Sequence, residues 1–184
     1  MKDLVLNITQ NTITLDNGSH VMHSWEDDLM RRKAEFVCSN GGDIIEFGFG
    51  LGISATYIQT QNINSHTICE IHPDILKNLN QWKLDKKNVI VLEGDWFDNI
   101  EKMSKYDGIL YDTHLDYNFS YFFRELIYKI SKKDTRLTWW NNYHYGHVGN
   151  GKPKNTEFEI IDVNPPQNDY FNNKQYFFPK YIFS

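Results

Sequence analysis

Short apolar runs alternate along the chain with segments in which apolar residues recur at helical spacing. Runs rich in Val, Ile, Leu, Tyr and Phe are typical of buried strands, and their alternation with helices indicates an α/β fold with a largely parallel, helix-covered sheet. The pattern predicts strands near residues 43–47, 67–71, 89–93, 108–112, 137–141, 157–163 and 176–182. It predicts helices over residues 24–38, 54–61, 73–82, 97–103 and 119–130.

The last two predicted strands are separated only by the segment NPPQNDYFNNK, which is too short for a crossover helix. We therefore expect an antiparallel hairpin at the edge of the sheet. The segment before this hairpin contains Gly146, Gly149 and Gly151, which break any helix, so the crossover between the fifth and sixth strands is expected to lack one. One face of the sheet would then be uncovered, and a second copy of the chain is a candidate to cover it.

The chain has 184 residues, of which 40% are hydrophobic, and this predicts a single domain with one core. We expect residues 1–40 to form an N-terminal lid and helix, and residues 41–184 to form the catalytic core. The 19 Lys and Arg are outnumbered by 24 Asp and Glu, which argues against a nucleic-acid partner. No apolar run is long enough for a signal peptide or a membrane span, so a cytoplasmic protein without a membrane partner is expected.

The segment DIIEFGFGLGISATYIQ places Gly48, Gly50 and Gly52 between a predicted strand and a predicted helix. Glycines at such a turn let the backbone pass close to a ligand beside the N-terminus of the helix. The spacing is GxGxG, and Ile53 stands where the dinucleotide fingerprint GxGxxG needs its third glycine. The turn therefore favours a nucleoside ligand without a pyrophosphate, and a turn used only for tight packing is the alternative.

Acidic and aromatic residues at the ends of the predicted strands extend this interpretation. Glu46 lies two residues before the first glycine, and Glu70 ends the next strand, where ribose hydroxyls need a carboxylate acceptor. After the third strand, Asp95 is a candidate to receive an adenine amino group, and Trp96 or Phe97 to cover the ring. S-adenosylmethionine fits this set, because it carries an amino group and a ribose for the carboxylates but no pyrophosphate.

Five segments together resemble the guanidinoacetate methyltransferase family, which includes related fungal-type arginine N-methyltransferases: VMHSWEDDLM, IIEFGFGLGISATYIQ, HTICEIHPDIL, LEGDW and YDGILYDTH. The resemblance spans roughly residues 21–141 and resumes in the C-terminal segments IIDVNPP and YFFPKY. It implies a class I methyltransferase fold, which is a Rossmann-like seven-stranded mostly parallel sheet with an antiparallel C-terminal hairpin. It also implies S-adenosyl-L-methionine as the cofactor and a guanidino group as the methyl acceptor.

The resemblance assigns roles to individual residues. By resemblance, Met22 closes over a cofactor pocket formed by Gly48, Phe49, Gly50, Leu51, Gly52, Ile53, Glu70, Ile71, His72, Trp96 and Phe97. Glu26 and Asp112 would hold the guanidino group, and the backbone at Asn142 and Tyr143 would hold the far end of the substrate. No metal site is expected.

The chemistry of the acceptor agrees with this assignment. A guanidinium is planar, cationic and a poor nucleophile, so it must lose a proton as it is methylated. Two carboxylates can grip its N–H groups, orient one nitrogen and accept that proton. We assign the base to Asp112, which ends the fourth strand, and expect Glu26 to belong also to a lid that excludes water. The structural alternatives are an Asp that caps a turn and a Glu that favours a helix dipole.

The sequence therefore predicts an S-adenosylmethionine-dependent N-methyltransferase that acts on a small guanidino compound, with guanidinoacetate as the first candidate. Methylation of arginine in a protein or peptide is the second hypothesis, because a missing crossover would open the substrate side to a larger acceptor. A cofactor-binding or interaction protein without turnover is the third.

Overall fold

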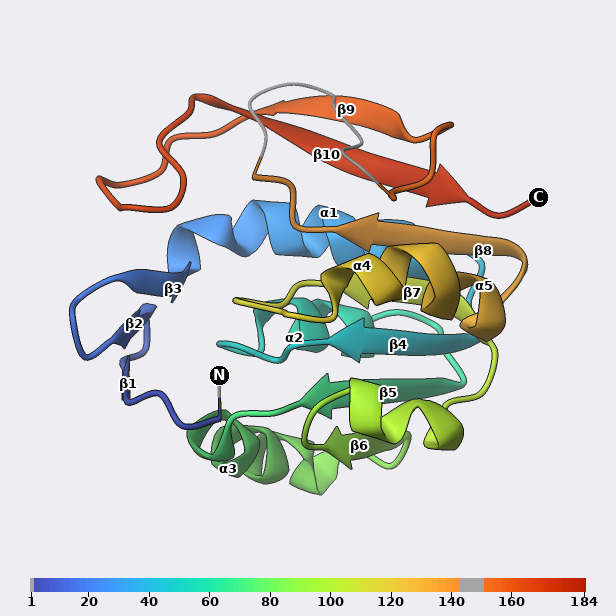
Figure 1. Ribbon diagram of the computed structural model, residues 1–184, viewed down its shortest axis with the longest axis horizontal. Helices are drawn as coiled ribbons and strands as arrows, with labels where there is room; N and C mark the ends of the chain where they lie inside the picture. The colour runs from blue at the N-terminus through green and yellow to red at the C-terminus, as the bar shows by residue number, and fades with distance from the viewer. Residues whose placement is uncertain (1, 143–150) are drawn as a thin grey trace.

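The computed structural model describes residues 2–142 and 151–184. They form a seven-stranded sheet with the order β6-β5-β4-β7-β8-β10-β9 and a three-stranded sheet with the order β1-β2-β3 (Figure 1). The strands of the large sheet are β4 (Asp43–Phe47), β5 (Ser65–Glu70), β6 (Val89–Glu93), β7 (Tyr106–Tyr111), β8 (Ser131–Trp139), β9 (Glu157–Asp162) and β10 (Gln175–Ile182). Each overlaps a strand predicted from the hydrophobic pattern, which is thereby confirmed.

Parallel pairing dominates the large sheet. Strand β4 pairs in parallel with β5 and β7, β5 pairs with β6, and β7 pairs with β8. Strand β10 is antiparallel to both β8 and β9, as expected for the C-terminal hairpin. From β4 the chain adds β5 and β6 toward one edge of the sheet, and it then returns to the other side of β4 to add β7 and β8. The strand order therefore reverses between β4 and β7, and the carboxyl ends of these two strands form a topological switch point. Open α/β sheets bind their ligands at such points.

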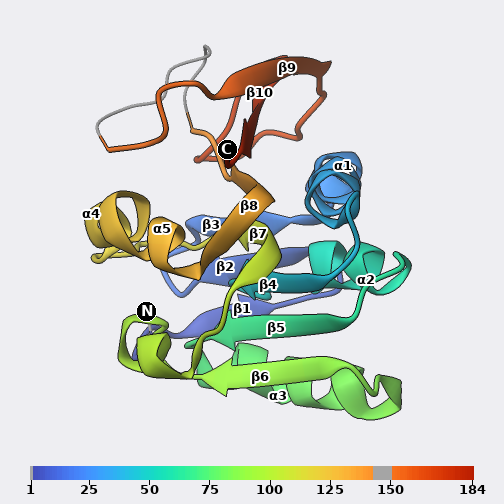
Figure 2. The ribbon, with the colours of Figure 1, turned by 90° about the vertical axis from the view of Figure 1, so that its right-hand side faces the viewer.

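Helices cover both faces of the sheet (Figure 2). One face carries α1 (Asp27–Cys38), α2 (Ile53–Gln59) and α3 (Pro73–Trp82), and short turns precede α1 and follow α3 at η1 (Ser24–Glu26) and η2 (Lys83–Asp85). The other face carries η3 (Phe97–Lys102) and one helical segment made of α4 (Phe119–Tyr121), η4 (Phe122–Leu126) and α5 (Ile127–Ile130). The apolar residues Phe122, Phe123, Leu126, Ile127 and Ile130 of this last segment are buried in the core.

The small N-terminal sheet was not predicted. Its strands are β1 (Leu6–Ile8), β2 (Thr12–Leu15) and β3 (His20–His23), which are too short and too polar to show a clear alternation. Ile13 is 1% exposed and belongs to one apolar cluster with Phe49, Ile68 and Ile75, which lie in or beside the large sheet. The N-terminal sheet is therefore packed against the segment that follows β4.

The connection between β8 and β9 contains no helix within its described residues, 140–142 and 151–156, and the absence of a crossover helix stays a prediction. Tyr143, Gly146 and Gly149 lie outside the described residues. Assembly with a second copy through this side of the sheet stays a prediction. In the part of the chain that the structure describes, no helix is long and apolar enough to cross a membrane.

Candidate functional site

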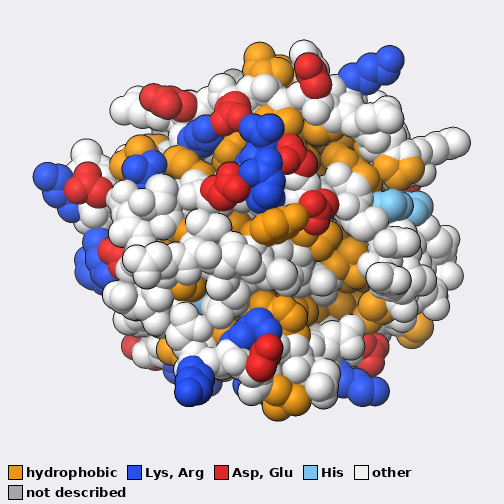
Figure 3. All heavy atoms as spheres, turned by 180° about the vertical axis from the view of Figure 1, so that it is seen from behind, with side chains coloured by type: hydrophobic (Ala, Val, Ile, Leu, Met, Phe, Trp, Pro, Cys, Tyr) orange, Lys and Arg blue, Asp and Glu red, His pale blue; other side chains and the backbone are white. Residues whose placement is uncertain are grey.

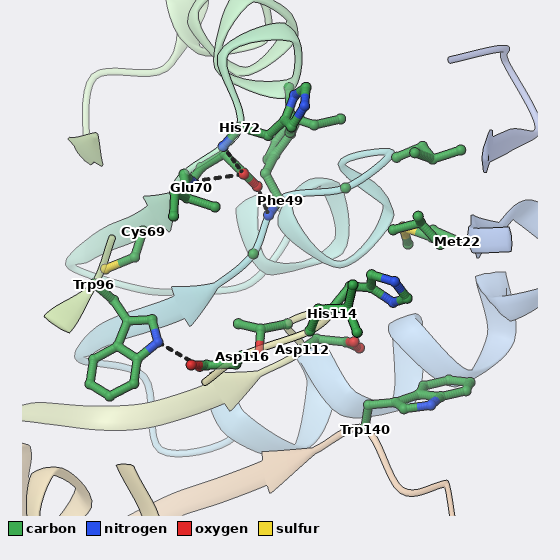
Figure 4. A pocket seen from close by; sticks show the side chains of 18 of the residues that line it. Met22, Phe49, Cys69, Glu70, His72, Trp96, Asp112, His114, Asp116 and Trp140 are labelled. Carbon is green, nitrogen blue, oxygen red and sulfur yellow. Dashed lines mark hydrogen bonds between the residues drawn. The ribbon is translucent and has the colours of Figure 1, made fainter. Parts of the chain in front are cut away.

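A cavity of about 820 Å³ lies at the carboxyl edge of the sheet and is lined by residues that follow β4, β5, β6, β7 and β8 (Figure 4). Its volume falls in the range of small-molecule and cofactor sites. Nine of the predicted cofactor-binding residues line it: Met22, Gly48, Phe49, Gly50, Glu70, Ile71, His72, Asp95 and Trp96. The predicted acceptor residues Glu26, Asp112 and Asn142 line the same cavity.

The turn after β4 has left-handed backbone at two glycines that line the cavity. Gly48 has a φ of 88°, and a Cβ atom there would lie 2.2 Å from the backbone oxygen of Asp112. Gly50 has a φ of 55°, and a Cβ atom there would lie 2.4 Å from the sulfur of Met22. Left-handed backbone and missing side chains therefore let this turn pass between the end of β7 and strand β3. The result is a backbone-lined floor for a ligand.

Glu70 holds this turn in place from the end of β5. Its Oε2 accepts the Phe49 N–H at 2.9 Å, and its Oε1 accepts the N–H groups of Ile71 and His72 at 2.8 Å each (Figure 4). Burial raises the pKa of Glu70 above its ordinary value, although the three amide donors act in the opposite direction. Glu70 lies at the cavity, as expected, and its contact with a ribose stays a prediction.

Four predicted cofactor-binding residues do not line the cavity. Gly52 is the N-cap of α2, Ile53 is its first residue, and Leu51 packs against the apolar cluster beside the N-terminal sheet. Phe97 is 41% exposed and packs its ring against Tyr121 at 5.2 Å on the other face of the sheet. Of the three glycines in the motif, Gly48 and Gly50 line the cavity and Gly52 does not.

Glu46 is also absent from the cavity lining. It is fully buried, because alternation along β4 directs its side chain toward the face covered by α2. There it accepts a hydrogen bond from Ser54 Oγ and lies 3.1 Å from His66 Nε2. The expectation that Glu46 faces the cofactor is wrong, and this carboxylate instead joins α2 to β4 and β5.

The segment after β6 forms another wall of the cavity. Asp95 Oδ1 accepts the Phe97 N–H at 2.9 Å and so begins η3. Trp96 is 6% exposed, and its Nε1 donates to Asp116 Oδ2 at 2.6 Å (Figure 4). Its ring packs edge-on against Phe47 at 5.9 Å. Trp96 therefore belongs largely to the core and presents only a small part of its ring to a ligand.

Glu26 lies at the acceptor end of the cavity on η1. Its Oε1 accepts the N–H of His23 at 3.0 Å, which closes a capping box, and the hydroxyl of Tyr170 at 2.5 Å. Glu26 is only 3% exposed. Burial and the nearby charge of Asp112 raise the pKa of Glu26 from its ordinary value of 4.5 to about 7.

Asp112 follows β7 and is held by a lysine that sequence reasoning missed. Lys33 Nζ lies 3.1 Å from Asp112 Oδ2, and the lysine side chain is fully buried. The available signal was a charged residue within the inward stripe of α1 formed by Met30, Ala34 and Val37. Periodicity alone cannot tell which distant group would pair with it.

Aromatic residues complete the acceptor end. Trp140 and Tyr170 line the cavity, and Asn142 accepts a hydrogen bond from Trp140 Nε1. Tyr170 comes from the loop between β9 and β10, and its hydroxyl accepts the indole Nε1–H of Trp25 at 2.9 Å. Nothing in the local sequence predicted that this loop would reach the cavity. The remaining predicted acceptor residue, Tyr143, lies outside the described residues.

Comparison with known proteins identifies this arrangement. The family model described as guanidinoacetate N-methyltransferase matches residues 7–157, which is more than half of the chain. The chain belongs to the guanidinoacetate N-methyltransferase family. The predicted resemblance to this family is thereby confirmed, and the fold agrees with it.

One curated relative and two solved structures are similar to this member of the guanidinoacetate N-methyltransferase family. Protein arginine N-methyltransferase 2 from Candida glabrata is 31% identical, and the match covers 94% of the chain and 49% of that protein. The chain thus spans about half the length of this relative. Spermidine synthase from Thermotoga maritima superposes with a TM-score of 0.71 at 11% identity, covering 99% of the chain and 70% of that structure. The crystal structure of SMU.776 complexed with SAH has a TM-score of 0.62 at 12% identity. The match covers 98% of the chain and 56% of that structure. At such low identity the two structures support the fold alone.

Proposed function

We propose that this protein transfers a methyl group from S-adenosylmethionine to a nitrogen of a guanidino group. The observation that carries the proposal is the meeting of two carboxylates from distant parts of the chain, Glu26 and Asp112, at one end of a cavity. Burial first, and the charge of Asp112 second, raise the pKa of Glu26. The other end of that cavity is the glycine turn.

The residues of the cavity fit the cofactor. Gly48 and Gly50 leave a floor that any Cβ atom would obstruct, and Glu70 and Asp95 offer carboxylates beside it. When bound, S-adenosylmethionine supplies an electrophilic methyl group. Met22 lies over the turn, with its sulfur 3.2 Å from the backbone nitrogen of Leu51, so β3 forms part of a cover that limits the access of water.

The acceptor end fits a planar cation. Two carboxylates can take the N–H groups of a guanidinium as charge-assisted hydrogen bonds. Trp140 and Tyr170 supply aromatic surface beside them, which favours a delocalised cation. The acceptor nitrogen forms its bond to the methyl carbon as the carbon–sulfur bond breaks, and one proton from that nitrogen passes to a carboxylate of the pair. The methylated product remains a cation.

Two acceptor classes share this guanidino chemistry. The family to which the chain belongs favours guanidinoacetate or a similar small molecule. The name of the C. glabrata relative, protein arginine N-methyltransferase 2, favours an arginine side chain as the second candidate. Both acceptors need the same two carboxylates, so the test must compare them directly.

Mass spectrometry with methyl-labelled S-adenosylmethionine separates these candidates. Purified protein is incubated with guanidinoacetate, free arginine and an arginine-containing peptide in parallel. Label in a small guanidino compound supports the first acceptor, and label in the peptide alone supports the second. Absence of label from all guanidino compounds, despite measurable cofactor binding, would overturn the proposed function and leave a binding protein without turnover.

Substitution of Asp112 tests whether the carboxylate pair is required. Asp112→Asn is expected to reduce kcat by roughly 100-fold or more, because it removes a charged partner of the acceptor. The affinity for S-adenosylhomocysteine, measured by calorimetry, is expected to change by less than about 3-fold, since Asp112 lies at the acceptor end. Asp107→Asn on the same strand, where Asp107 pairs with Lys132 at 2.7 Å, is the matched control. Equal activities of the two variants would remove Asp112 from the site.

A further inference from the structure

Lys33 differs from the other basic residues of its helix. Arg31 and Arg32 lie on the outer face of α1, where both pair with Asp28, and Arg31 also pairs with Glu35. Figure 3 shows this face, with basic and acidic side chains gathered together over α1. Lys33 points the other way and is fully buried. A lysine in such a position is costly unless its charge is compensated, so its partner defines its role.

The compensating groups all lie at the acceptor end of the site. Lys33 Nζ is 3.1 Å from Asp112 Oδ2. It also lies 4.7 Å from the ring centre of Trp140 and 5.5 Å from that of Tyr176, in cation–π geometry. Lys33 is not among the residues that line the cavity. It therefore acts on an acceptor through Asp112 and not by touching the acceptor itself.

We propose that Lys33 is a positioning residue that fixes Asp112 as the anchor of the acceptor, and that Glu26 receives the proton released by methyl transfer. This inference rests on the proposed function and assigns the proton to a different carboxylate from the one expected from the sequence. Protonation of Asp112 would remove the carboxylate that is in contact with a fully buried ammonium. Protonation of Glu26 removes a buried charge instead.

The hydrogen bonds of Glu26 agree with this division of roles. His23 N–H and the Tyr170 hydroxyl both donate to Oε1, which leaves Oε2 without a donor among the described residues. The site thus holds one carboxylate fixed by a cation and one with an oxygen open to a proton. Burial first, and the charge of Asp112 second, raise the pKa of Glu26 to about 7. Lys33 and the two donors oppose this rise.

The other titratable groups near the pair do not take over this role. Burial lowers the pKa of Lys33, but Asp112, Tyr176 and Glu26 outweigh it, and the net pKa is raised, so Lys33 stays charged. Burial and hydrogen bonding raise the pKa of Tyr170 well above its ordinary value. His114, which also lines the cavity, has its pKa lowered mainly by burial.

The combined charge of Glu26, Asp112 and Lys33 suits the binding of one guanidinium cation. Ionised Glu26 and Asp112 together with Lys33 carry a net charge of −1, which one guanidinium neutralises. When Glu26 takes the proton, the same three groups carry no net charge while the methylated product is still a cation. The electrostatic hold on the product is weaker than the hold on the substrate, which favours product release.

The pH dependence of kcat/KM tests the proposal. In the unmodified protein, kcat/KM is expected to rise with pH through a midpoint near 7, as Glu26 loses its proton. Lys33→Met removes the cation, so the two carboxylates share one proton more tightly, and the midpoint is expected to rise by about one pH unit. Activity at pH 7 is expected to fall about 5-fold. Lys33→Arg keeps the charge and is expected to restore the midpoint.

Lys132→Met is the matched control, because Lys132 also pairs with aspartates, at 2.7 Å from Asp107, but lies away from the cavity. If Lys33→Met still binds S-adenosylhomocysteine but its kcat/KM profile has the same pH midpoint as that of Lys132→Met, the role of Lys33 is overturned. Carboxyl NMR titration gives a readout that does not need turnover. Titration of Glu26 near pH 7 in the unmodified protein, and at a higher pH in Lys33→Met, supports the proposal. If no guanidino compound is methylated, the proposed function fails, and this titration still tests the role of Lys33 separately. Titration of Glu26 near its ordinary value would overturn it.

Discussion

Replacement of Glu26 by glutamine is expected to stabilise the protein above neutral pH. Glu26 is 3% exposed and its pKa is raised from 4.5 to about 7, mainly by burial. Glutamine has nearly the same shape, and its Oε1 can still accept the His23 N–H and the Tyr170 hydroxyl. The substitution therefore removes a buried charge while it keeps both hydrogen bonds.

The sign and magnitude of the effect follow from proton linkage. Between pH 4.5 and about 7 the folded protein binds more protons at Glu26 than the unfolded chain, so the free energy of unfolding falls as pH rises through this window. Above it, the full cost of holding the buried carboxylate ionised corresponds to about 3 kcal/mol, at ~1.4 kcal/mol per pH unit. For a chain of this size, that predicts a Tm higher by about 10 °C in Glu26→Gln at pH 8.

Urea unfolding followed by tryptophan fluorescence, at pH 5 and pH 8, measures this difference. We expect Glu26→Gln to exceed the unmodified protein in stability at pH 8 and to be close to it at pH 5. Glu35→Gln on the exposed face of α1, where Glu35 pairs with Arg31 at 2.7 Å, should change stability by less than ~1 kcal/mol at either pH. A stability gain of Glu26→Gln that does not depend on pH would refute the reasoning, because it would show that ionisation of Glu26 is not the source.

Two further substitutions test the acceptor end and the glycine turn. Tyr170→Phe removes a hydrogen bond that lowers the pKa of Glu26. The midpoint of the kcat/KM profile should therefore move upward, by about 0.5 to 1 pH unit, and an unchanged midpoint would mean that this hydroxyl does not act on the base. Gly48→Ala places a Cβ atom 2.2 Å from the Asp112 backbone, and calorimetry should show at least about 10-fold weaker binding of S-adenosylhomocysteine. Gly18→Ala is its control, because Gly18 has a similar φ of 85° and no atom within 4 Å of the added Cβ, so equal binding by the two variants would contradict the argument.

Much of the fold was predictable because its signals are local. Most strands of the large sheet carry an apolar run, and α3 begins at Pro73 and ends at Trp82 as the pattern indicates. The short strands β1, β2 and β3 have no such run, and they are held by contacts such as the packing of Ile13 in one apolar cluster with Phe49 and Ile68. Their position depends on a surface that only the folded chain provides.

The site divides in the same way. Gly48, Gly50 and Asp112 were recognisable in the sequence because a turn after one strand and an acid after another must meet at the same edge of a parallel sheet. Glu46 was misjudged because the direction of its side chain depends on the pleat of β4 and on its contact with Ser54 of α2. The position of Glu46 in the sequence shows how many residues separate it from the glycine turn, but not which face of the sheet its side chain points to.

The sequence by itself determined the order of the elements, the glycine turn and the presence of two acids that a guanidino acceptor needs. Only the tertiary structure decided how those acids differ. Lys33 and Asp112 are 79 positions apart, and Glu26 and Tyr170 are 144 positions apart, yet each pair is in hydrogen-bond contact. Proton affinity depends on burial and on charges within a few ångströms, and those neighbours come from segments that only folding brings together.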